Sequence, residues 1–348
     1  MINVLITGAA GYIGAMLIDQ LARCDSIGML NGIDIKARPA RLGDCAKLRW
    51  ICADVAEDQW ASQFDDEQID VVIHCAYQIR EMYGRGRDQQ HRWNIDGARK
   101  VFEFALGRPS LCRLVQLSTV SAYGALPTNS MDRPLTEEAP LCEDDYLYGV
   151  QKRQVETLLR QSVERLRPSA HVVVLRLASV SGPRGRFGLN RYGLLSTVAG
   201  GFPVLICGRA DWGRQYLHED DLVGVLSMFV HLPPTTGFQV FNVSPTDFLG
   251  SAALGRLFDK RVVVLPPALL RTQFFLTWHG SRGAVTTPRG AWRFLTYPIR
   301  VDGGRLSQVY GYEYRYSSLQ ALVAQEGRYA PRARPCSLPA AASKPPSA

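Results

Sequence analysis

The sequence predicts an α/β protein built on a doubly wound parallel sheet, with a smaller C-terminal lobe. Short apolar runs alternate with helical stretches up to about residue 177, and a glycine-rich turn follows the first run. Beyond about residue 180 the alternation is lost, and glycine, proline and arginine become frequent. We therefore expect a sheet domain at 1–177, a substrate lobe at 178–330 partly interleaved with the sheet, and a disordered, Pro/Ser/Ala-rich tail at 331–348.

The individual elements follow from apolar runs and apolar periodicity. Short apolar runs predict strands at Ile2–Thr7, Met29–Ile35, Leu48–Ala53, Val71–Cys75, Leu114–Ser118 and Val172–Leu177. Apolar residues at helical spacing predict helices at Ala15–Arg23, His91–Leu106 and Gln151–Leu166. Strands that alternate with helices of this length form parallel sheets with helices on both faces.

Composition excludes several classes of protein. Hydrophobic residues make up 46% and charged residues 21% of the 348 residues, which is ordinary for a globular protein. No apolar stretch reaches the length of a membrane span, and the N-terminus lacks the features of a signal peptide, so we expect a cytoplasmic protein. The eight cysteines show neither CxxC pairs nor zinc-ligand spacing. We expect free thiols and no metal.

The charge is basic but dispersed. The formal net charge is +8, and the 40 basic residues, nearly all arginine, are spread along the chain. No basic stripe interleaved with aromatic residues and no DNA-reading motif occurs, so nucleic acid is not expected as a partner. A few arginines can instead hold a substrate phosphate or carboxylate through paired hydrogen bonds.

The turn after the first strand carries three glycines, Gly8, Gly11 and Gly14. Glycines permit a tight turn, close approach of the backbone to a pyrophosphate, and close packing of helix on strand. The N-terminus of the following helix offers unpaired N–H groups and the positive end of a dipole. The spacing predicts a phosphate-binding turn, although a purely structural turn has the same pattern.

An acidic residue supports the nucleotide-binding interpretation. Asp34 ends the second expected strand, where a carboxylate accepts hydrogen bonds from the adenosine ribose hydroxyls of a dinucleotide. Its charge would repel a 2′-phosphate, which favours NAD over NADP, while Arg38 and Arg41 just beyond keep NADP open. Asp54, at the end of the third strand, is placed to meet the adenine edge or to cap a helix.

Several segments resemble one known family. With Thr7 in front, TGAAGYIG resembles the fingerprint of the extended short-chain dehydrogenases/reductases of the NAD-dependent epimerase/dehydratase type, which are UDP-glucose 4-epimerase-like. Further segments match in the family's order over about residues 1–325, namely His74–Ala76, Asn94–Gly97, Ser118–Gly124, Tyr148–Lys152, Arg176–Pro183, Arg214–Asp221 and Phe241–Ser244. The resemblance implies a Rossmann-type domain and an NAD site that also involves Tyr12, Ile13, Val55, Cys75, Ala76 and Asn94.

Tyr148 and Lys152 form a Tyr-x-x-x-Lys pair. Four-residue spacing puts both on one side of a helix, and a nearby ammonium is expected to lower the pKa of the phenol toward a working range. Tyr146 is a rival base, but the spacing selects Tyr148. By resemblance, Thr119 hydrogen-bonds the reacting oxygen, and both Tyr148 and Lys152 contact the cofactor. The expected chemistry is proton removal by Tyr148 with hydride transfer to NAD.

The residues after Thr119 narrow the reaction. Sugar-nucleotide 4,6-dehydratases carry acidic residues there, but this chain has Val120 and Ser121, which argues against dehydration. Arg214 matches the arginine that grips a substrate diphosphate in sugar-nucleotide members, and its alternative is an ion pair with Glu219 or Asp220. Asn190 and Arg293 are weaker candidates for the same pocket.

A sugar-nucleotide substrate does not explain one apolar segment, Arg261–His279. It predicts either a packed helix of the second lobe or a lid over a lipid-like substrate. Its two prolines and short apolar runs argue against a membrane span.

The leading hypothesis is an NAD-dependent nucleotide-sugar epimerase. The alternative is an NAD(P)-dependent hydroxyl/keto dehydrogenase or reductase acting on a steroid-like or polyketide-like substrate, and a third possibility is a non-catalytic NAD sensor. The resemblance also implies a homodimer that pairs through His91–Leu106 and Gln151–Leu166.

Overall fold

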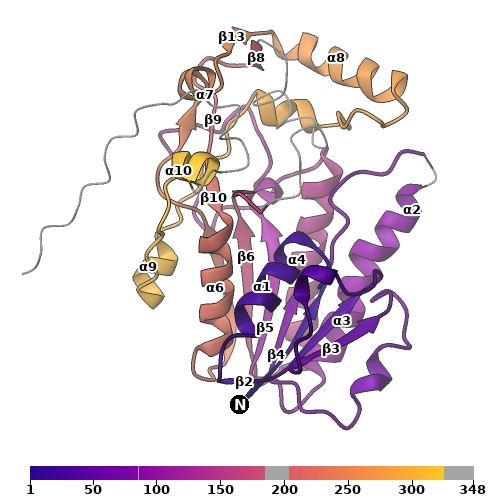
Figure 1. Ribbon diagram of the computed structural model, residues 1–348. Coiled ribbons are helices and arrows are strands. Elements are labelled where there is room, and N and C mark those ends of the chain that lie inside the picture. Colours follow the sequence, from indigo (N-terminus) through magenta and orange to yellow (C-terminus); the bar gives the residue numbers. More distant parts are fainter. Residues whose placement is uncertain (85, 185–203, 325–348) are drawn as a thin grey trace, which may run out of the picture.

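A parallel sheet forms the centre of the molecule (Figure 1). The computed structural model describes residues 1–84, 86–184 and 204–324. Seven strands pair in the order β11-β6-β5-β4-β1-β2-β3, all parallel. Their bounds are β1 (Ile2–Thr7), β2 (Ile27–Asp34), β3 (Leu48–Cys52), β4 (Val71–His74), β5 (Arg113–Thr119), β6 (His171–Leu177) and β11 (Gly237–Val243). Strand order reverses between β1 and β4, the position at which doubly wound sheets bind ligands.

Helices cover both faces of this sheet. On one face α1 (Tyr12–Leu21) packs against α6 (Glu219–His231), and on the other α3 (Gly97–Leu106) packs against α4 (Leu147–Leu166). Successive strand residues point to opposite faces, so neighbours such as Ile6 and Leu5 belong to different apolar clusters. The Rossmann-type fold expected from the sequence is confirmed.

The observed bounds differ from the expected ones in ways that matter for the site. The glycine turn runs directly into α1, which begins three residues before Ala15. α4 begins at Leu147, so Tyr148 lies in its first turn. The helix expected at His91–Leu106 is divided into α2 (Gly86–His91), a π-helical turn (Arg92–Asp96) and α3. The π-helical turn carries Asn94.

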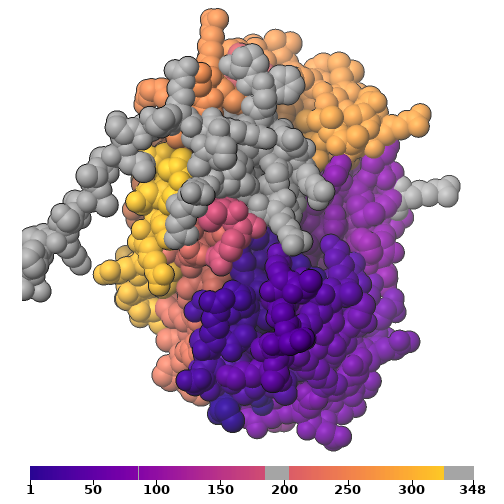
Figure 2. Space-filling model, in the orientation of Figure 1, coloured from indigo at the N-terminus to yellow at the C-terminus, as the bar shows by residue number. Residues whose placement is uncertain are grey.

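The C-terminal lobe has its own core and lies over one end of the sheet domain (Figure 2). Three short strand pairs occur: β7 (Ser179–Ser181) with β10 (Tyr216–His218), β8 (Val204–Cys207) with β13 (Arg261–Val264), and β9 (Gly213–Arg214) with β12 (Leu249–Gly250). Its described helices are α7 (Ser251–Leu257), α8 (Pro267–Gly280) and α10 (Ser318–Val323), whereas α9 (Arg305–Tyr310) packs on β11 of the sheet.

The expected tail at 331–348 lies outside the described residues. Within the described part of the chain, no helix has the length and apolar character needed to cross a bilayer.

Candidate functional site

The backbone of the glycine turn leaves no room for a side chain at Gly8, Gly11 or Gly14. Gly8 has a φ of +67°, and a Cβ there would lie 2.6 Å from the Ala76 backbone nitrogen. A Cβ on Gly11 would lie 2.9 Å, and one on Gly14 2.4 Å, from the Gly8 carbonyl oxygen. Side chains at these positions would push the turn away from β4 and fill the space that a pyrophosphate needs. The turn therefore fits a dinucleotide.

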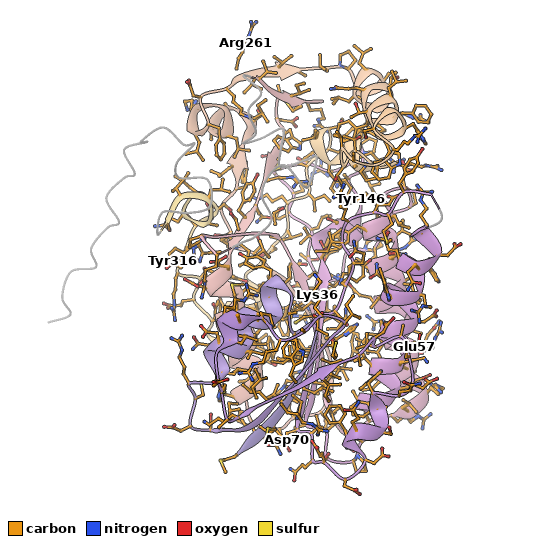
Figure 3. The ribbon with its side chains drawn as sticks, turned by 45° about the vertical axis from the view of Figure 1, so that its right-hand side comes forward. Lys36, Glu57, Asp70, Tyr146, Arg261 and Tyr316 are labelled. Atoms are coloured by element: carbon orange, nitrogen blue, oxygen red, sulfur yellow. The ribbon has the colours of Figure 1, made fainter. Side chains whose placement is uncertain are left out.

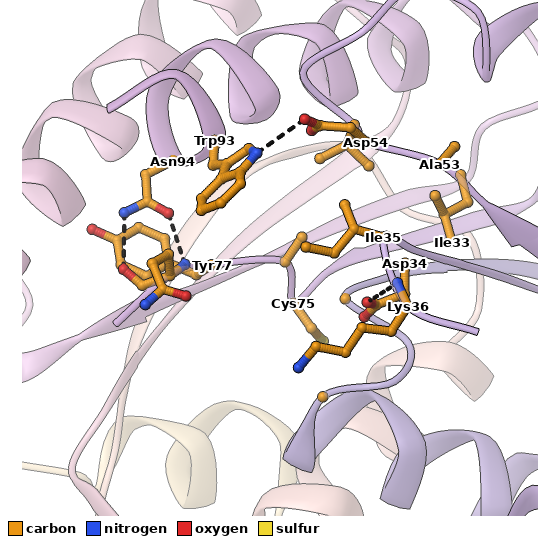
Figure 4. Close-up of a pocket in the computed structure, with 15 residues that line it drawn as sticks. Ile33, Asp34, Ile35, Lys36, Ala53, Asp54, Cys75, Tyr77, Trp93 and Asn94 are labelled. Carbon is orange, nitrogen blue, oxygen red and sulfur yellow. Dashed lines mark hydrogen bonds between the residues drawn. The ribbon is translucent and has the colours of Figure 1, made fainter. Parts of the chain in front are cut away.

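A pocket opens beside this turn at the carboxyl ends of β1 to β4 (Figure 4). It encloses about 790 Å³ of empty space, partly open to solvent, and Gly8, Gly11 and Asp34 line it. Asp34 accepts hydrogen bonds from the Ala10 nitrogen at 2.9 Å and from the Lys36 nitrogen at 3.0 Å, one on each oxygen. Each carboxylate oxygen retains a lone pair for a ribose hydroxyl.

Some of the residues expected to bind NAD line this pocket, and others do not. Asp54, Val55, Cys75, Ala76 and Asn94 line it. Tyr12 and Ile13 lie in the first turn of α1 and are not among the lining residues. The sequence had not indicated seven further lining residues, which are Ile33, Ile35, Lys36, Ala53, Tyr77, Gln78 and Trp93.

The carboxylate of Asp54 is already engaged by the protein. One oxygen accepts from the Ala56 nitrogen at 2.9 Å, as a cap would, and the other accepts from Trp93 Nε1 at 2.9 Å and from Arg92 at 2.8 Å (Figure 4). Asn94 is engaged in the same way, because its amide donates to Gln151 Oε1 at 2.8 Å. Both residues shape the pocket wall through these bonds.

The two arginines beyond Asp34 take different positions. Arg38 bonds carbonyl oxygens of its own loop, at Leu42 and Gly43. Arg41 donates to the Gly11 carbonyl oxygen at 3.3 Å and so lies beside the glycine turn. Lys36 lines the pocket next to Asp34 (Figure 4). Two cations, Lys36 and Arg41, therefore lie beside the part of the pocket that Asp34 and the glycine turn form.

The three expected catalytic residues meet where β5 ends and α4 begins. Thr119 is the last residue of β5 and is buried, and its Oγ1 accepts from the Ser121 nitrogen at 3.1 Å. The Thr119 side chain lies near the Tyr148 hydroxyl, and the Tyr148 ring lies edge-on to Tyr77 and Tyr146 at 5.6 and 6.0 Å between centroids. The structure thus places Thr119 and Tyr148 close together.

The expected lowering of the Tyr148 pKa by Lys152 is not found. Burial raises the pKa of Tyr148 to about 12, and the nearby Thr119 side chain offsets only part of this rise. The Lys152 ammonium donates to the Leu117 carbonyl oxygen at 2.7 Å and lies 3.8 Å from the centroid of the Tyr77 ring. Lys152 is therefore held by other groups, and the protein alone keeps Tyr148 protonated at neutral pH.

Lys152 is itself an unusual lysine. It is 5% exposed, and burial lowers its pKa to about 7, although the charges of Cys75 and Glu156 act in the opposite direction. Its pKa in the folded protein lies below the ordinary 10.5, so the native state binds fewer protons than the unfolded chain. The free energy of unfolding should therefore rise with pH between about 7 and 10.5. Below pH 7 the folded protein bears the full cost of burying the charged Lys152 ammonium.

Replacing Lys152 by methionine should stabilise the protein measured without added NAD. Removing the cost of a buried charge should raise the free energy of unfolding at pH 7 by ~2 kcal/mol. Urea unfolding at pH 7 and at pH 10 measures this, and the gain should shrink at the higher pH. Lys47→Met is the control, because Lys47 also donates to a backbone oxygen but is only half-buried. A loss of stability in Lys152→Met would contradict the prediction.

A buried polar network supports the end of β5. Glu156 on α4 accepts from Ser118 at 2.5 Å and forms an ion pair with Arg176 on β6 at 2.8 Å. Arg176 also donates to the Tyr123 hydroxyl at 2.7 Å, which donates to Asn242 on β11 at 2.8 Å. These bonds tie β5, β6, β11 and α4 together next to Thr119, and no pattern in the sequence indicates them.

Arg214 lies in a second pocket next to the catalytic residues. The pocket has about 380 Å³ of empty space, part of it open to solvent, and includes Val120 and Ser121, which follow Thr119. The guanidinium lies 3.4 Å from Ser179 Oγ and 6.0 Å from the Trp212 ring, and burial lowers the pKa of Arg214. Its side chain forms no ion pair with any described residue.

The alternative reading of Arg214 as an ion-pair partner of Glu219 or Asp220 is wrong. Arg184 bonds both carboxylates, and Glu219 also accepts from the Tyr12 hydroxyl. Those acids are therefore occupied on the α1 side, which leaves Arg214 directed to its pocket.

Of the other two substrate candidates, the described one, Arg293, does not join Arg214. Arg293 pairs with Asp144 at 2.8 Å and lines a third pocket beside α8. Asn190 lies outside the described residues.

Comparisons with known proteins agree with this geometry. A model of the NAD dependent epimerase/dehydratase family matches residues 4–244. A probable UDP-glucuronate 4-epimerase of Rhizobium meliloti is 26% identical over 259 residues, which cover 72% of this chain and 74% of the relative. An uncharacterized protein of Mycobacterium tuberculosis is 29% identical over 233 residues, or 64% of this chain. That match spans only 57% of the mycobacterial protein.

Solved structures extend the likeness in fold. A UDP-glucuronic acid 4-epimerase from Bacillus cereus, crystallised with UDP-glucuronic acid and NAD, has a TM-score of 0.68 and 20% identity, covering 92% of this chain and 96% of its own. The glycine turn and Asp34 fit the cofactor that gives the family its name, and NAD is the cofactor here. The chain belongs to the NAD-dependent epimerase/dehydratase family.

Proposed function

We propose that this protein is a nucleotide-sugar epimerase. One observation carries the proposal: the pocket that holds Arg214, a cation without an ion-pair partner among the described residues, begins at the residues that follow Thr119. A diphosphate held by Arg214 would place the attached sugar toward Thr119 and Tyr148. The Rhizobium and Bacillus proteins, whose names state a UDP-glucuronate epimerase activity, support this class of substrate.

The residues after Thr119 favour epimerisation over dehydration. Elimination of water from a sugar needs an acid and a base beside the reacting carbons. Here the positions hold Val120 and Ser121, which cannot supply a carboxyl group. Epimerisation needs only that a hydroxyl be oxidised, the resulting ketone be turned, and its other face be reduced.

NAD, which the glycine turn and Asp34 would hold, would supply reversible hydride exchange with the sugar carbon. Tyr148 takes the hydroxyl proton as the C–H bond breaks and gives it back as the alcohol re-forms, so no net oxidation results. Thr119 holds the reacting oxygen through its hydroxyl. Tyr148 starts from a pKa of about 12 in the protein alone, so the positive charge that oxidised NAD would bring to the site must favour the phenolate.

The proposal is tested by incubating the protein with NAD and a panel of nucleotide sugars that includes UDP-glucuronic acid. Proton NMR should show inversion at one sugar carbon, while absorbance at the NADH maximum shows no net reduction. Accumulation of NADH with any alcohol would instead favour the dehydrogenase alternative. A keto-deoxy sugar, the product expected from net loss of water, would contradict the argument from Val120 and Ser121.

We also propose that two copies pair through α3 and α4. These helices pack on each other in one copy and leave Phe104 and Leu158 only half-buried. Light scattering of the full chain should give the mass of a dimer, and a monomer at micromolar concentration would contradict this.

A further inference from the structure

The outer face of α8 and the adjoining β13 edge expose apolar side chains. Leu269, Phe275 and Leu276 on α8 are 57%, 61% and 63% exposed, and Val264 at the end of β13 is 48% exposed. The inner face of α8 packs into the molecule through other residues, Leu270, Phe274 and Trp278. The inner face therefore holds α8 in place, and the apolar residues of its outer face do not contribute to the core of the lobe.

The same region is basic. From 261 to 301 the chain contains six arginines and no aspartate or glutamate. Arg289 and Arg293 are neutralised by Asp145 and Asp144 of the sheet domain. Arg261, Arg271 and Arg282 are exposed and pair with none of the described acids.

These residues lie at one end of the molecule. In Figure 1, β13 and α8 form the top edge of the lobe, far from the strands of the sheet domain. In Figure 3 the Arg261 side chain points away from the body of the protein. We use the term α8 face for Arg261, Val264, Leu269, Arg271, Phe275, Leu276 and Arg282.

We propose that the α8 face docks on an anionic lipid bilayer. A helix lying in the interface inserts leucine and phenylalanine side chains below the headgroups. Arginines at the same level meet the lipid phosphates with paired hydrogen bonds, while their stems cover apolar surface. The α8 face carries both kinds of side chain and no acid.

Two other occupants fit less well. A second copy would bring two acid-free, arginine-bearing faces together, and like charges in an interface repel. A lid over the substrate would have to turn its apolar residues toward Arg214. Instead α8 borders a separate pocket, lined by Arg271, Phe275 and Trp278, that shares no residue with the pocket of Arg214.

The test is co-sedimentation of the full chain, with NAD, on two kinds of vesicle. One kind contains phosphatidylglycerol mixed with phosphatidylcholine, and the other is pure phosphatidylcholine. The protein should sediment with the first kind only, and added salt should weaken the binding because it screens the charges. Equal sedimentation with both kinds, or with neither, would overturn the proposal.

Two variants of equal net charge distinguish binding through the α8 face from an effect of the overall charge of the protein. Changing three arginines of the face to glutamine should weaken partitioning roughly a hundredfold, since each basic residue near an anionic surface contributes about fivefold. A control that removes the same net charge elsewhere should stay close to wild type. The face variant is R261Q/R271Q/R282Q and the control is R23Q/R133Q/R315Q.

The apolar residues are tested in the same assay. Leu269→Gln/Phe275→Gln/Leu276→Gln should lose vesicle binding, whereas Val309→Gln, on exposed α9, should keep it. Thermal melting and NAD affinity should match wild type in every variant, which shows that folding is intact. If the two triple arginine variants lose vesicle binding equally, binding depends on the net charge of the protein, and the assignment to the α8 face is overturned. A dimer that falls apart in the face variants would identify the face as a self-interface and overturn it as well.

Discussion

Replacing Tyr148 by phenylalanine is expected to lower turnover by 10²–10⁴-fold, roughly 3–5 kcal/mol of barrier, while NAD affinity stays nearly unchanged. The phenyl ring still fills its place beside Tyr77 and Tyr146. The hydroxyl is lost, so no group remains to exchange a proton with the substrate. Turnover is measured with the substrate found in the nucleotide-sugar panel, and NAD binding by calorimetry.

Tyr146→Phe is the matched control for this variant. Its ring lies 6.0 Å from that of Tyr148 and packs on Phe294, so the substitution tests a neighbouring phenol without touching the pair with Thr119. It should keep most of the activity. If Tyr148→Phe retains more than about a tenth of wild-type turnover, the acid–base assignment is wrong.

The pH dependence of the turnover rate distinguishes the role of Tyr148 from that of Lys152. In the protein alone the pKa of Tyr148 is about 12, so the wild-type rate should rise with pH as more phenolate forms. Lys152→Met should lower the rate and also loosen NAD, and high pH should restore part of its rate at saturating NAD. Tyr148→Phe should show no recovery. A flat wild-type profile above pH 7 would contradict this account.

The cofactor side of the site could be predicted because local chain geometry determines it. A glycine turn between a strand and a helix places Gly8, Gly11 and Gly14 in one compact loop whatever the rest of the fold does. Asp34 follows from the end of the next strand, and Tyr148 and Lys152 share one face of a helix by their spacing. Each signal needs only a few neighbouring residues.

Long-range partners could not be predicted in the same way. Lys152 lies over Tyr77, 75 positions earlier, and Tyr12 meets Glu219 across 207 positions. Such contacts depend on the order of the strands and on which helices share a sheet face. The pKa values of Tyr148 and Lys152 were missed for the same reason, since burial sets both and spacing carries no information on burial.

Arg214→Ala is expected to weaken nucleotide-sugar binding on the order of a hundredfold, or about 2–3 kcal/mol, without weakening NAD. Arg214 lines the pocket beside Thr119 and not the NAD pocket, so the effect should appear in the Michaelis constant of the sugar nucleotide. Folding should be preserved, because the side chain is desolvated and leaves no described carboxylate unpaired when it is removed.

The control is Arg209→Ala, in the same region of the lobe, whose guanidinium is held by Asp211 at 2.6 Å. It should leave the Michaelis constant unchanged. UDP alone should lose as much affinity for Arg214→Ala as the sugar nucleotide does, because the diphosphate is the group that Arg214 would hold. If the Michaelis constant and UDP affinity are both unchanged, the substrate is not gripped through a diphosphate at this position. The dehydrogenase acting on a non-nucleotide alcohol would then be the better account of the site.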